Sequence, residues 1–314
     1  MNKKLLALFV SGFLFVTLLG NWTTVQAQTS QTEESSAIAL PFDADADGSA
    51  FVPSDRQQSD QPYDDSRVII GRDDRAPVLS RHYPWSAIGR LEQPTADGRG
   101  LRTCTGTLIG RDLVLTNSHC IVDDKTNRPT RSPITFKPSM INGVSLDEAT
   151  VTDYDYGWKS GSQNSADDWA VLKLDQPLGD IYGYLGWRSL DFSDADVRAA
   201  AAEKVMLAGY SGDFPTAKLR EFGRFGTTAG VDGACSILDA ANGLLFHDCD
   251  TNPGASGSAI LGLFDDNRYY ILGLHAGSNE LGRSARLPDG TITGAINRGL
   301  QVPRWAARAA AMRS

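Results

Sequence analysis

The chain has 314 residues, of which 41% are hydrophobic and 22% are charged, and its net charge is −8. This composition is typical of a globular protein, and the length allows one large domain or two small ones. Because the chain has no surplus of basic residues, we do not expect it to bind nucleic acid.

The N-terminus has the features of a secretory signal peptide over residues 1–27. Lys3 and Lys4 precede the almost purely apolar run Leu5–Gly20, and Val25–Ala27 offers a small-x-small cleavage site. The apolar run is about 16 residues long, whereas a membrane span needs roughly 20. An uncleaved anchor is the alternative. We expect a secreted or periplasmic protein with no stable membrane insertion after removal of this signal.

Residues 28–67 differ in composition from both neighbouring parts of the chain. They are rich in Gln, Ser and Asp, and nine acidic residues stand against Arg56 and Arg67, which gives a net charge of −7. Residues 68–314 carry only −3 by the same count. A stretch with so few large apolar side chains cannot build a core, so we expect an acidic, disordered pro-segment.

From Val68 onward the pattern is mostly that of β-strands. Short apolar or alternating runs are separated by Gly and polar residues, which favours a β-sandwich or barrels. Only the tail at 302–312, with a proline near its start and an alanine-rich body, predicts a helix. A polar, irregular segment around 175–200 separates two halves of similar size. The predicted strands lie at 86–91, 107–110, 112–117, 169–174, 203–210, 258–264 and 269–277.

Four cysteines in a secreted chain predict two disulfides, for which three pairings are possible. Local pairing is the simplest, because Cys104 and Cys120 are 16 residues apart and Cys235 and Cys249 are 14 residues apart. Each bridge of this size stabilises a fold by about 3 kcal/mol in the chain-entropy description. We expect no zinc site, because no C-x-x-C spacing occurs. No other metal and no cofactor is expected.

Polar residues of three chemical types stand out along the chain. His119 follows an alternating strand in "LVLTNSHC", and Asp167 and Asp168 precede the apolar strand "WAVLKL". Ser256 lies among small residues in "DTNPGASGSAI". A general base, an orienting carboxylate and a nucleophilic hydroxyl are the parts of Ser-His-Asp catalysis. Singly, each has an ordinary structural explanation, as a core histidine, a solvated acid or a loop serine.

The chain order His119, Asp168, Ser256 resembles that of the chymotrypsin-like serine proteases. "CTGTLIGRDLVLTNSHC" is similar to their histidine segment, including the cysteine bridge around it. "DWAVLKL" is similar to their aspartate strand, which selects Asp168 over Asp167, and "PGASGSAI" is similar to their serine segment.

This resemblance implies an all-β fold, with two antiparallel β-barrels and a short C-terminal helix. Barrel one would occupy about 68–180 and barrel two about 181–300. The backbone N–H groups of Gly254 and Ser256 would form the oxyanion hole, where a Cβ on residue 254 would hinder the turn. The implied activity is hydrolysis of protein or peptide substrates through an acyl-enzyme.

Two further stretches resemble the glutamyl endopeptidases of the V8 type, "VIIGRDDR" from Val68 and "ILGLHAGS" around His275. That resemblance implies processing after Arg67 and activation of a zymogen. The freed amine of Val68 would then bind the acidic side chain of the substrate together with Thr251 and His275, and Ser278 would add a hydroxyl. An imidazole and hydroxyl donors suit a carboxylate ligand. The acidic pro-segment could occupy the same site before processing.

Some residues leave alternatives open. Ala255 replaces the aspartate that pairs with the new N-terminal ammonium in the larger family, although glutamyl endopeptidases also lack it. Asp250, six residues before Ser256, matches the position that selects Lys and Arg in trypsin, so cleavage after basic residues is an alternative. A protease fold that has lost catalysis and acts as a binding protein is another. We assign no role to His82 or His247, and we expect a monomer.

Overall fold

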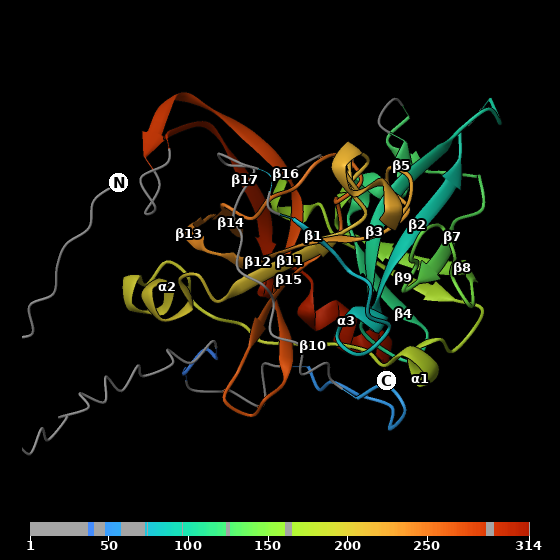
Figure 1. Ribbon diagram of the computed structural model, residues 1–314, viewed down its shortest axis with the longest axis horizontal. Helices are drawn as coiled ribbons and strands as arrows, with labels where there is room; N and C mark the ends of the chain where they lie inside the picture. The colour runs from blue at the N-terminus through green and yellow to red at the C-terminus, as the bar shows by residue number, and fades with distance from the viewer. Residues whose placement is uncertain are drawn as a thin grey trace, which may run out of the picture. The chain divides into compact units, whose positions relative to one another are not determined.

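The computed structural model shows a mostly β protein with a short C-terminal helix (Figure 1). All the residues it describes fall within the compact unit Ser35–Ser314. No helix among these residues has the length and apolar character that a membrane crossing requires. The structure describes residues 37–40, 48–57, 73, 75–95, 97–123, 126–160, 165–286 and 292–313.

The first half of the fold is a closed antiparallel barrel. Its strands are β2 (Ile88–Pro94), β3 (Leu101–Leu108), β4 (Leu113–Thr116), β7 (Thr135–Pro138), β8 (Ala149–Tyr156) and β9 (Ala170–Leu174). They pair in the order β2-β3-β4-β9-β8-β7. Every residue of β4 is buried, because β3 and β9 pair with its two edges and side chains cover both faces. This buried strand ends at Thr116, three residues before His119.

The second half is a nine-stranded sheet. Its strands are β1 (Ala76–Pro77), β10 (Gly186–Trp187), β11 (Val205–Gly209), β12 (Gly230–Cys235), β13 (Ile237–Ala241), β14 (Leu244–His247), β15 (Ala259–Leu263), β16 (Tyr269–Arg286) and β17 (Ile292–Gln301). The pairing order is β1-β12-β11-β15-β16-β17-β14-β13, and β10 pairs with β16. The prediction of an all-β fold is confirmed; the strand pairing closes the first half into a barrel and forms a sheet in the second half.

Two short strands differ from the expected arrangement. β1 lies in the range 68–180 that we expected in barrel one, but its Ala76 pairs with Val231 of β12 in the second sheet. β10 runs parallel to β16, whereas we expected antiparallel strands throughout. From β1 onward, the chain therefore pairs first with the second sheet, then forms the first barrel and then returns to the second sheet.

Three short α-helices complete the described part of the fold. They are α1 (Gly179–Tyr182), α2 (Ala195–Ala201) and α3 (Ala306–Arg313). α1 and α2 lie in the segment around 175–200 that we expected to be irregular. The side chain of Asp194 caps α2 by accepting a hydrogen bond from the backbone N–H of Asp196 at 2.7 Å. The predicted C-terminal helix begins with a 3-10 turn at Val302–Arg304, which contains the proline, before α3.

Part of the expected pro-segment has a defined position. Residues 37–40 and 48–57 lie against the folded unit, and Ile38 is fully buried in its second core. The expectation of disorder is wrong for these two stretches, because apolar residues interspersed among the acids anchor them. The remaining residues of 28–67, like the expected signal peptide, lie outside the described part of the chain.

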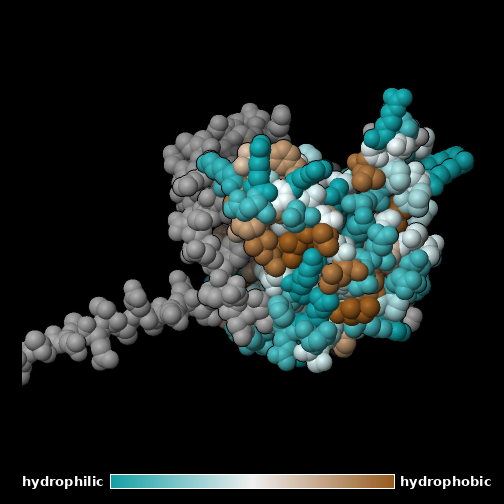
Figure 2. Space-filling model, turned by 45° about the vertical axis from the view of Figure 1, so that its right-hand side comes forward, coloured by the Kyte–Doolittle hydropathy of each residue, from teal (hydrophilic) through white to brown (hydrophobic). Residues whose placement is uncertain are grey.

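The face drawn in Figure 2 is mostly hydrophilic, with hydrophobic residues in small separate patches. Exposed large apolar residues of the described chain include Leu79, Leu101 and Phe225. Scattered residues of this kind are normal on protein surfaces.

Candidate active site

His119 lies just beyond the end of β4, in a single 3-10 turn. The side-chain amide of Asn117 donates a hydrogen bond to the backbone oxygen of Asp168 at 2.7 Å. The hydroxyl of Ser118 donates to the backbone oxygen of Trp169, also at 2.7 Å. These two bonds brace the turn that carries His119 against the start of β9.

Asp168 is bound to His119 through both carboxylate oxygens. Its Oδ1 accepts the backbone N–H of His119 at 2.9 Å, and its Oδ2 lies 2.7 Å from His119 Nδ1. Asp168 is only 2% exposed. An ionised carboxylate only accepts, so Nδ1 carries the proton and Nε2 keeps its lone pair. The neighbouring Asp167 instead forms an ion pair with Arg304, so the structure brings Asp168 and not Asp167 to the imidazole.

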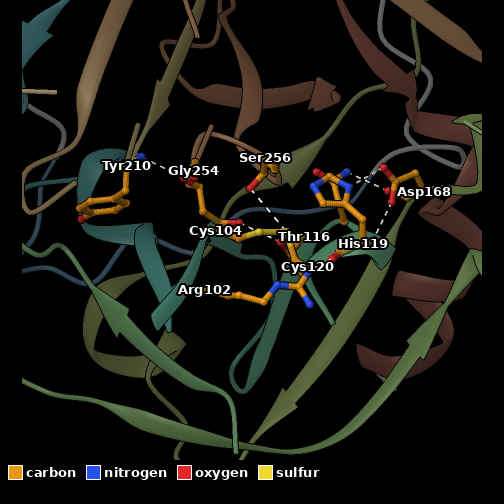
Figure 3. Close-up of a disulfide and its surroundings, with 11 residues drawn as sticks. Arg102, Cys104, Thr116, His119, Cys120, Asp168, Tyr210, Gly254 and Ser256 are labelled. Carbon is orange, nitrogen blue, oxygen red and sulfur yellow. Dashed lines mark hydrogen bonds and ion pairs between the residues drawn. A yellow bond between two sulfur atoms is a disulfide. The ribbon is translucent and has the colours of Figure 1, made fainter. Parts of the chain in front are cut away.

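Ser256 lies on the side of the His119 ring opposite Asp168 (Figure 3). The backbone oxygen of Ser256 accepts a hydrogen bond from the N–H of Thr105 in β3 at 2.9 Å. At Gly257, with φ of +86°, a Cβ would lie 2.2 Å from both Thr105 O and Thr116 Oγ1. The small residues around Ser256 therefore let its loop lie directly on the first barrel, beside His119.

Gly254 gives the turn before Ser256 its shape. Its φ is +106°, and a Cβ there would lie 2.5 Å from the backbone oxygen of Tyr210. In the described part of the chain, no acceptor takes a hydrogen bond from the N–H of Gly254 or of Ser256. Both N–H groups are therefore free to donate to a bound oxygen, and their role as an oxyanion hole stays a prediction.

Both disulfides follow the local pairing, which is confirmed. The Cys104–Cys120 bridge joins β3 to the turn that carries His119, and the Cys235–Cys249 bridge joins β12 to the segment before Asp250. The sulfurs of the first bridge lie within 4.8 Å of a His119 nitrogen. Because they are bonded to each other, they are not thiolates that could bind a metal.

His275 is buried on β16, directly behind the serine loop. Its backbone N–H donates to Ser258 O at 2.9 Å, and its backbone oxygen accepts from Gly257 N at 3.0 Å. Its Nδ1 lies 3.1 Å from Nε2 of His247, which is also buried. Burial lowers the pKa of His275 well below its usual range, and electrostatic interactions with His247, His119 and Arg298 lower it further. Burial lowers the pKa of His247 to about 3, so both rings are neutral near pH 7.

The other expected specificity residues have mixed positions. Thr251 is half-buried, and Ser278 is exposed on β16, just after the irregular pairing between His275 and Gly277. Asp250 is 2% exposed, and its backbone N–H donates to Asp232 Oδ2 at 2.8 Å. Val68 lies outside the described residues, as does Arg67.

Residues 104–268, more than half of the chain, match the family described as "Trypsin-like peptidase domain". The chain belongs to this family. It is therefore a member of a family of hydrolases that act on peptide bonds, and the fold described above is the one expected of it.

Individual proteins of similar sequence or structure are also named as proteases. A glutamyl endopeptidase of Bacillus licheniformis is 30% identical over 199 residues, which cover 62% of this chain and 54% of that protein. Serine protease 23 of Rattus norvegicus is 24% identical over 267 residues, which cover 76% of this chain and 61% of that protein. The chain thus spans less than two thirds of the length of either relative. A solved structure of a Glu endopeptidase in complex with MPD matches with a TM-score of 0.55 and 26% identity, over 77% of this chain and all of that one.

The sequence analysis did not identify two residues that lie near the candidate active site. His247 was given no role, yet it contacts His275. Arg298 of β17 lies opposite Gly277, and its Nη1 donates to the backbone oxygen of Ser278 at 3.1 Å. A signal for His247 exists in "LLFH", where alternation places Leu245 and His247 on one buried face. Nothing in the sequence singles out Arg298.

Proposed function

We propose that the chain is a secreted serine endopeptidase that cleaves by a Ser-His-Asp acyl-enzyme mechanism. The observation that carries this proposal is the 2.7 Å contact between His119 Nδ1 and Asp168 Oδ2, with Ser256 on the other side of the ring. The two disulfides fit an oxidising compartment.

In this mechanism each residue has a separate task. His119 Nε2 takes the proton of Ser256 Oγ as the oxygen attacks the peptide carbonyl. The N–H groups of Gly254 and Ser256 bind the negative oxygen that forms. Asp168 holds the imidazole in the correct tautomer and stabilises its protonated form. His119 then gives the proton to the leaving amine, and a water activated by the same ring releases the acyl group.

For the substrate we propose a preference for Glu or Asp before the cut. In a hydrogen bond between two neutral imidazoles, one ring donates its N–H and the other accepts it. If His247 Nε2–H donates to His275 Nδ1, the proton of the His275 ring lies on its Nε2. That N–H and the hydroxyls of Thr251 and Ser278 would be donors for a carboxylate. The guanidinium of Arg298, held at Ser278 O, would add a positive charge beside them.

The freed amine of Val68 remains part of this proposal. Arg75 is the nearest anchor in the described chain: it is buried, and its Nη2 lies 2.8 Å from Asp213 Oδ2. The same Asp213 oxygen accepts from Asn252 Nδ2 at 2.7 Å, two residues before Gly254. Arg75 is therefore held close to the serine loop through Asp213, and we propose that the amine of Val68 reaches the substrate from this side.

Matched peptides test the proposal. They differ only in the residue before the cut, which is Glu, Gln or Arg. We expect kcat/KM to fall in the order Glu, Gln, Arg, and Ser256→Ala to abolish cleavage of all three. Faster cleavage after Arg than after Glu would contradict the preference for acidic residues and would indicate that Asp250 selects basic residues. Failure of a fluorophosphonate probe to label Ser256 in the processed protein would favour the binding-protein alternative.

A further inference from the structure

The stretch between residues 37 and 57, which we call the strap, is held against the folded unit at its two described parts, 37–40 and 48–57. Ile38 is fully buried, its N–H donates to Leu263 O at 2.8 Å, and it pairs with Phe264 in parallel. It is one of the residues that form the second hydrophobic core, and Leu40 packs against the same core.

The second part of the strap is joined to β10 by a close backbone approach. Gly48 and Trp187 exchange two backbone hydrogen bonds, each 3.1 Å long. A Cβ on Gly48 would lie 2.5 Å from the Trp187 ring, and a Cβ on Gly186 would lie 2.1 Å from Gly48 O. The absence of a side chain at both Gly48 and Gly186 therefore allows the backbone of the strap to approach the backbone of β10.

Beyond Gly48 the strap is bound to the segment before β10 and to the C-terminal helix. Phe51 and Tyr184 exchange backbone hydrogen bonds of 3.0 and 2.9 Å, and their rings lie 5.5 Å apart. Arg313 of α3 donates to Ser49 O at 2.9 Å. Val52 packs against the first hydrophobic core. The strap thus contributes apolar side chains to both cores of the unit.

The strap contacts lie away from the candidate active site. In Figure 1 one blue segment lies at the lower left, beneath α2, and the other lies below β10 and beside α1. Among the described residues, the hydrogen bonds and ring contacts of the strap end on residues other than His119, Asp168, Ser256 and His275. The described parts of the strap are therefore not placed to block that site.

We propose that the strap is a permanent part of the working protein and stays bound when the chain is cut between it and β1. Release would open a hole at Ile38 in the second core and would leave backbone groups of Trp187 and Tyr184 without partners. Its two anchored parts are linked in one chain, so detachment of either part is followed by rapid rebinding. A mature form would accordingly consist of two chains held together without a covalent link.

An engineered cut tests this directly. A recognition site for an unrelated, site-specific protease is inserted between residues 60 and 61 of the full chain carrying Ser256→Ala, which prevents self-cleavage. The folded protein is cut, passed over a size-exclusion column and analysed by intact mass under denaturing conditions. We expect the fragment with the strap to elute with the body in a 1:1 ratio. Elution of the fragment at its own small size would overturn the proposal.

Two substitutions give a matched comparison at the anchor. Ile38→Asp places a charge in the core, so we expect at least about a tenfold fall in the fraction of fragment retained after the cut. Ala39→Asp changes the adjacent, exposed residue and should leave retention unchanged. Equal retention in both variants would show that Ile38 does not hold the strap. If Ile38→Asp prevents folding before the cut, the size-exclusion result for the protein with the unchanged strap still tests the proposal.

A last measurement tests whether the bound strap inhibits peptide hydrolysis. The same cut is made in the chain that keeps Ser256, and hydrolysis of a small peptide is followed while the strap is bound. We expect undiminished activity in the two-chain form. A rise in activity when denaturant at low concentration strips the strap would contradict the proposal. Retention in the Ser256→Ala protein is measured without any activity, so it stands or falls independently of the proposed function.

Discussion

His247 and His275 share a 3.1 Å hydrogen bond in the interior of the second sheet, although they come from different strands. β17 lies between these strands, and it places Gly299 opposite His275. A Cβ on Gly299 would lie 2.8 Å from Leu274 O and 3.0 Å from Ile260 Cδ1, so glycine lets β17 approach β16 closely here. The proton that the rings share decides whether His275 presents a donor or an acceptor to a substrate.

His247→Phe should weaken recognition of an acidic substrate without harming the chemistry. Phenylalanine keeps an aromatic ring in the core but cannot fix the tautomer of His275. We expect kcat/KM for the Glu peptide to fall about tenfold, the effect of losing one hydrogen bond to a charged group, mainly through KM. Hydrolysis of an otherwise identical Ala peptide should be unchanged. The exposed His82→Phe is the control, and an equal loss on both peptides would count against the assignment.

Arg298→Gln should reduce the preference for Glu over Gln substrates. The substitution keeps a donor near Ser278 O and removes the positive charge that lies beside His275. We expect the ratio of kcat/KM for Glu to that for Gln to fall by about tenfold, while the value for Gln changes little. Arg268→Gln, at an exposed residue of the β15–β16 turn, is the matched control. An unchanged ratio would remove Arg298 from the specificity site.

Asp168→Asn should lower kcat by about 10⁴, since an amide can donate to Nδ1 and favours the wrong tautomer of His119. The substituted side chain has nearly the same shape, so the fold should be kept. Asp167→Asn is the matched control, because Asp167 pairs with Arg304 and not with His119. Single-turnover kinetics on one peptide compares the two. Comparable losses of kcat in both variants would mean that catalysis depends on negative charge near β9 and not on the contact of Asp168 with His119.

The parts of the fold that could be predicted from sequence are those with local signals. β4, β9 and β15 are apolar runs because they are buried on both faces, and the three catalytic candidates are adjacent to them. β8 escaped prediction because Thr150, Asp153 and Tyr154 face solvent and break the apolar pattern. It becomes a strand through its pairing with β9, which no local sequence reveals.

The same limit applies to the candidate site. His119, Asp168 and Ser256 lie in recognisable segments, but the contact of His247 with His275 depends on the register of β14 and β16 against β17. The position of Arg298 depends on that register as well. The strap was misjudged for another reason. Its mean composition is acidic and polar, whereas its anchoring depends on single residues such as Ile38 and Gly48.

Gly254→Ala should lower activity more than stability. Alanine at φ of +106° is strained, and its Cβ would meet the backbone oxygen of Tyr210, so the turn must shift and move the N–H of residue 254. Loss of one oxyanion donor lowers kcat by about 10²–10³. Gly98→Ala is the control for the backbone strain alone, because Gly98 also has positive φ but no atom within 4 Å of its Cβ position. Equal kcat in the two variants would mean that the N–H of residue 254 does not act in the reaction.

The buried histidines should also make the fold sensitive to acid. In the unfolded chain a histidine takes up a proton near pH 6.5, whereas in the folded protein burial lowers the pKa of His247 to about 3. Between these values the unfolded state binds more protons, so stability is complete above pH 6.5 and falls as the pH decreases. The loss is at most about 1.4 kcal/mol per pH unit for each such histidine. His247→Phe, compared with the parent in a Ser256→Ala background by urea unfolding at pH 7, 5 and 4, should show a shallower decline. Parallel declines in the two proteins would mean that His247 is protonated without cost in the folded state, and that water reaches the ring.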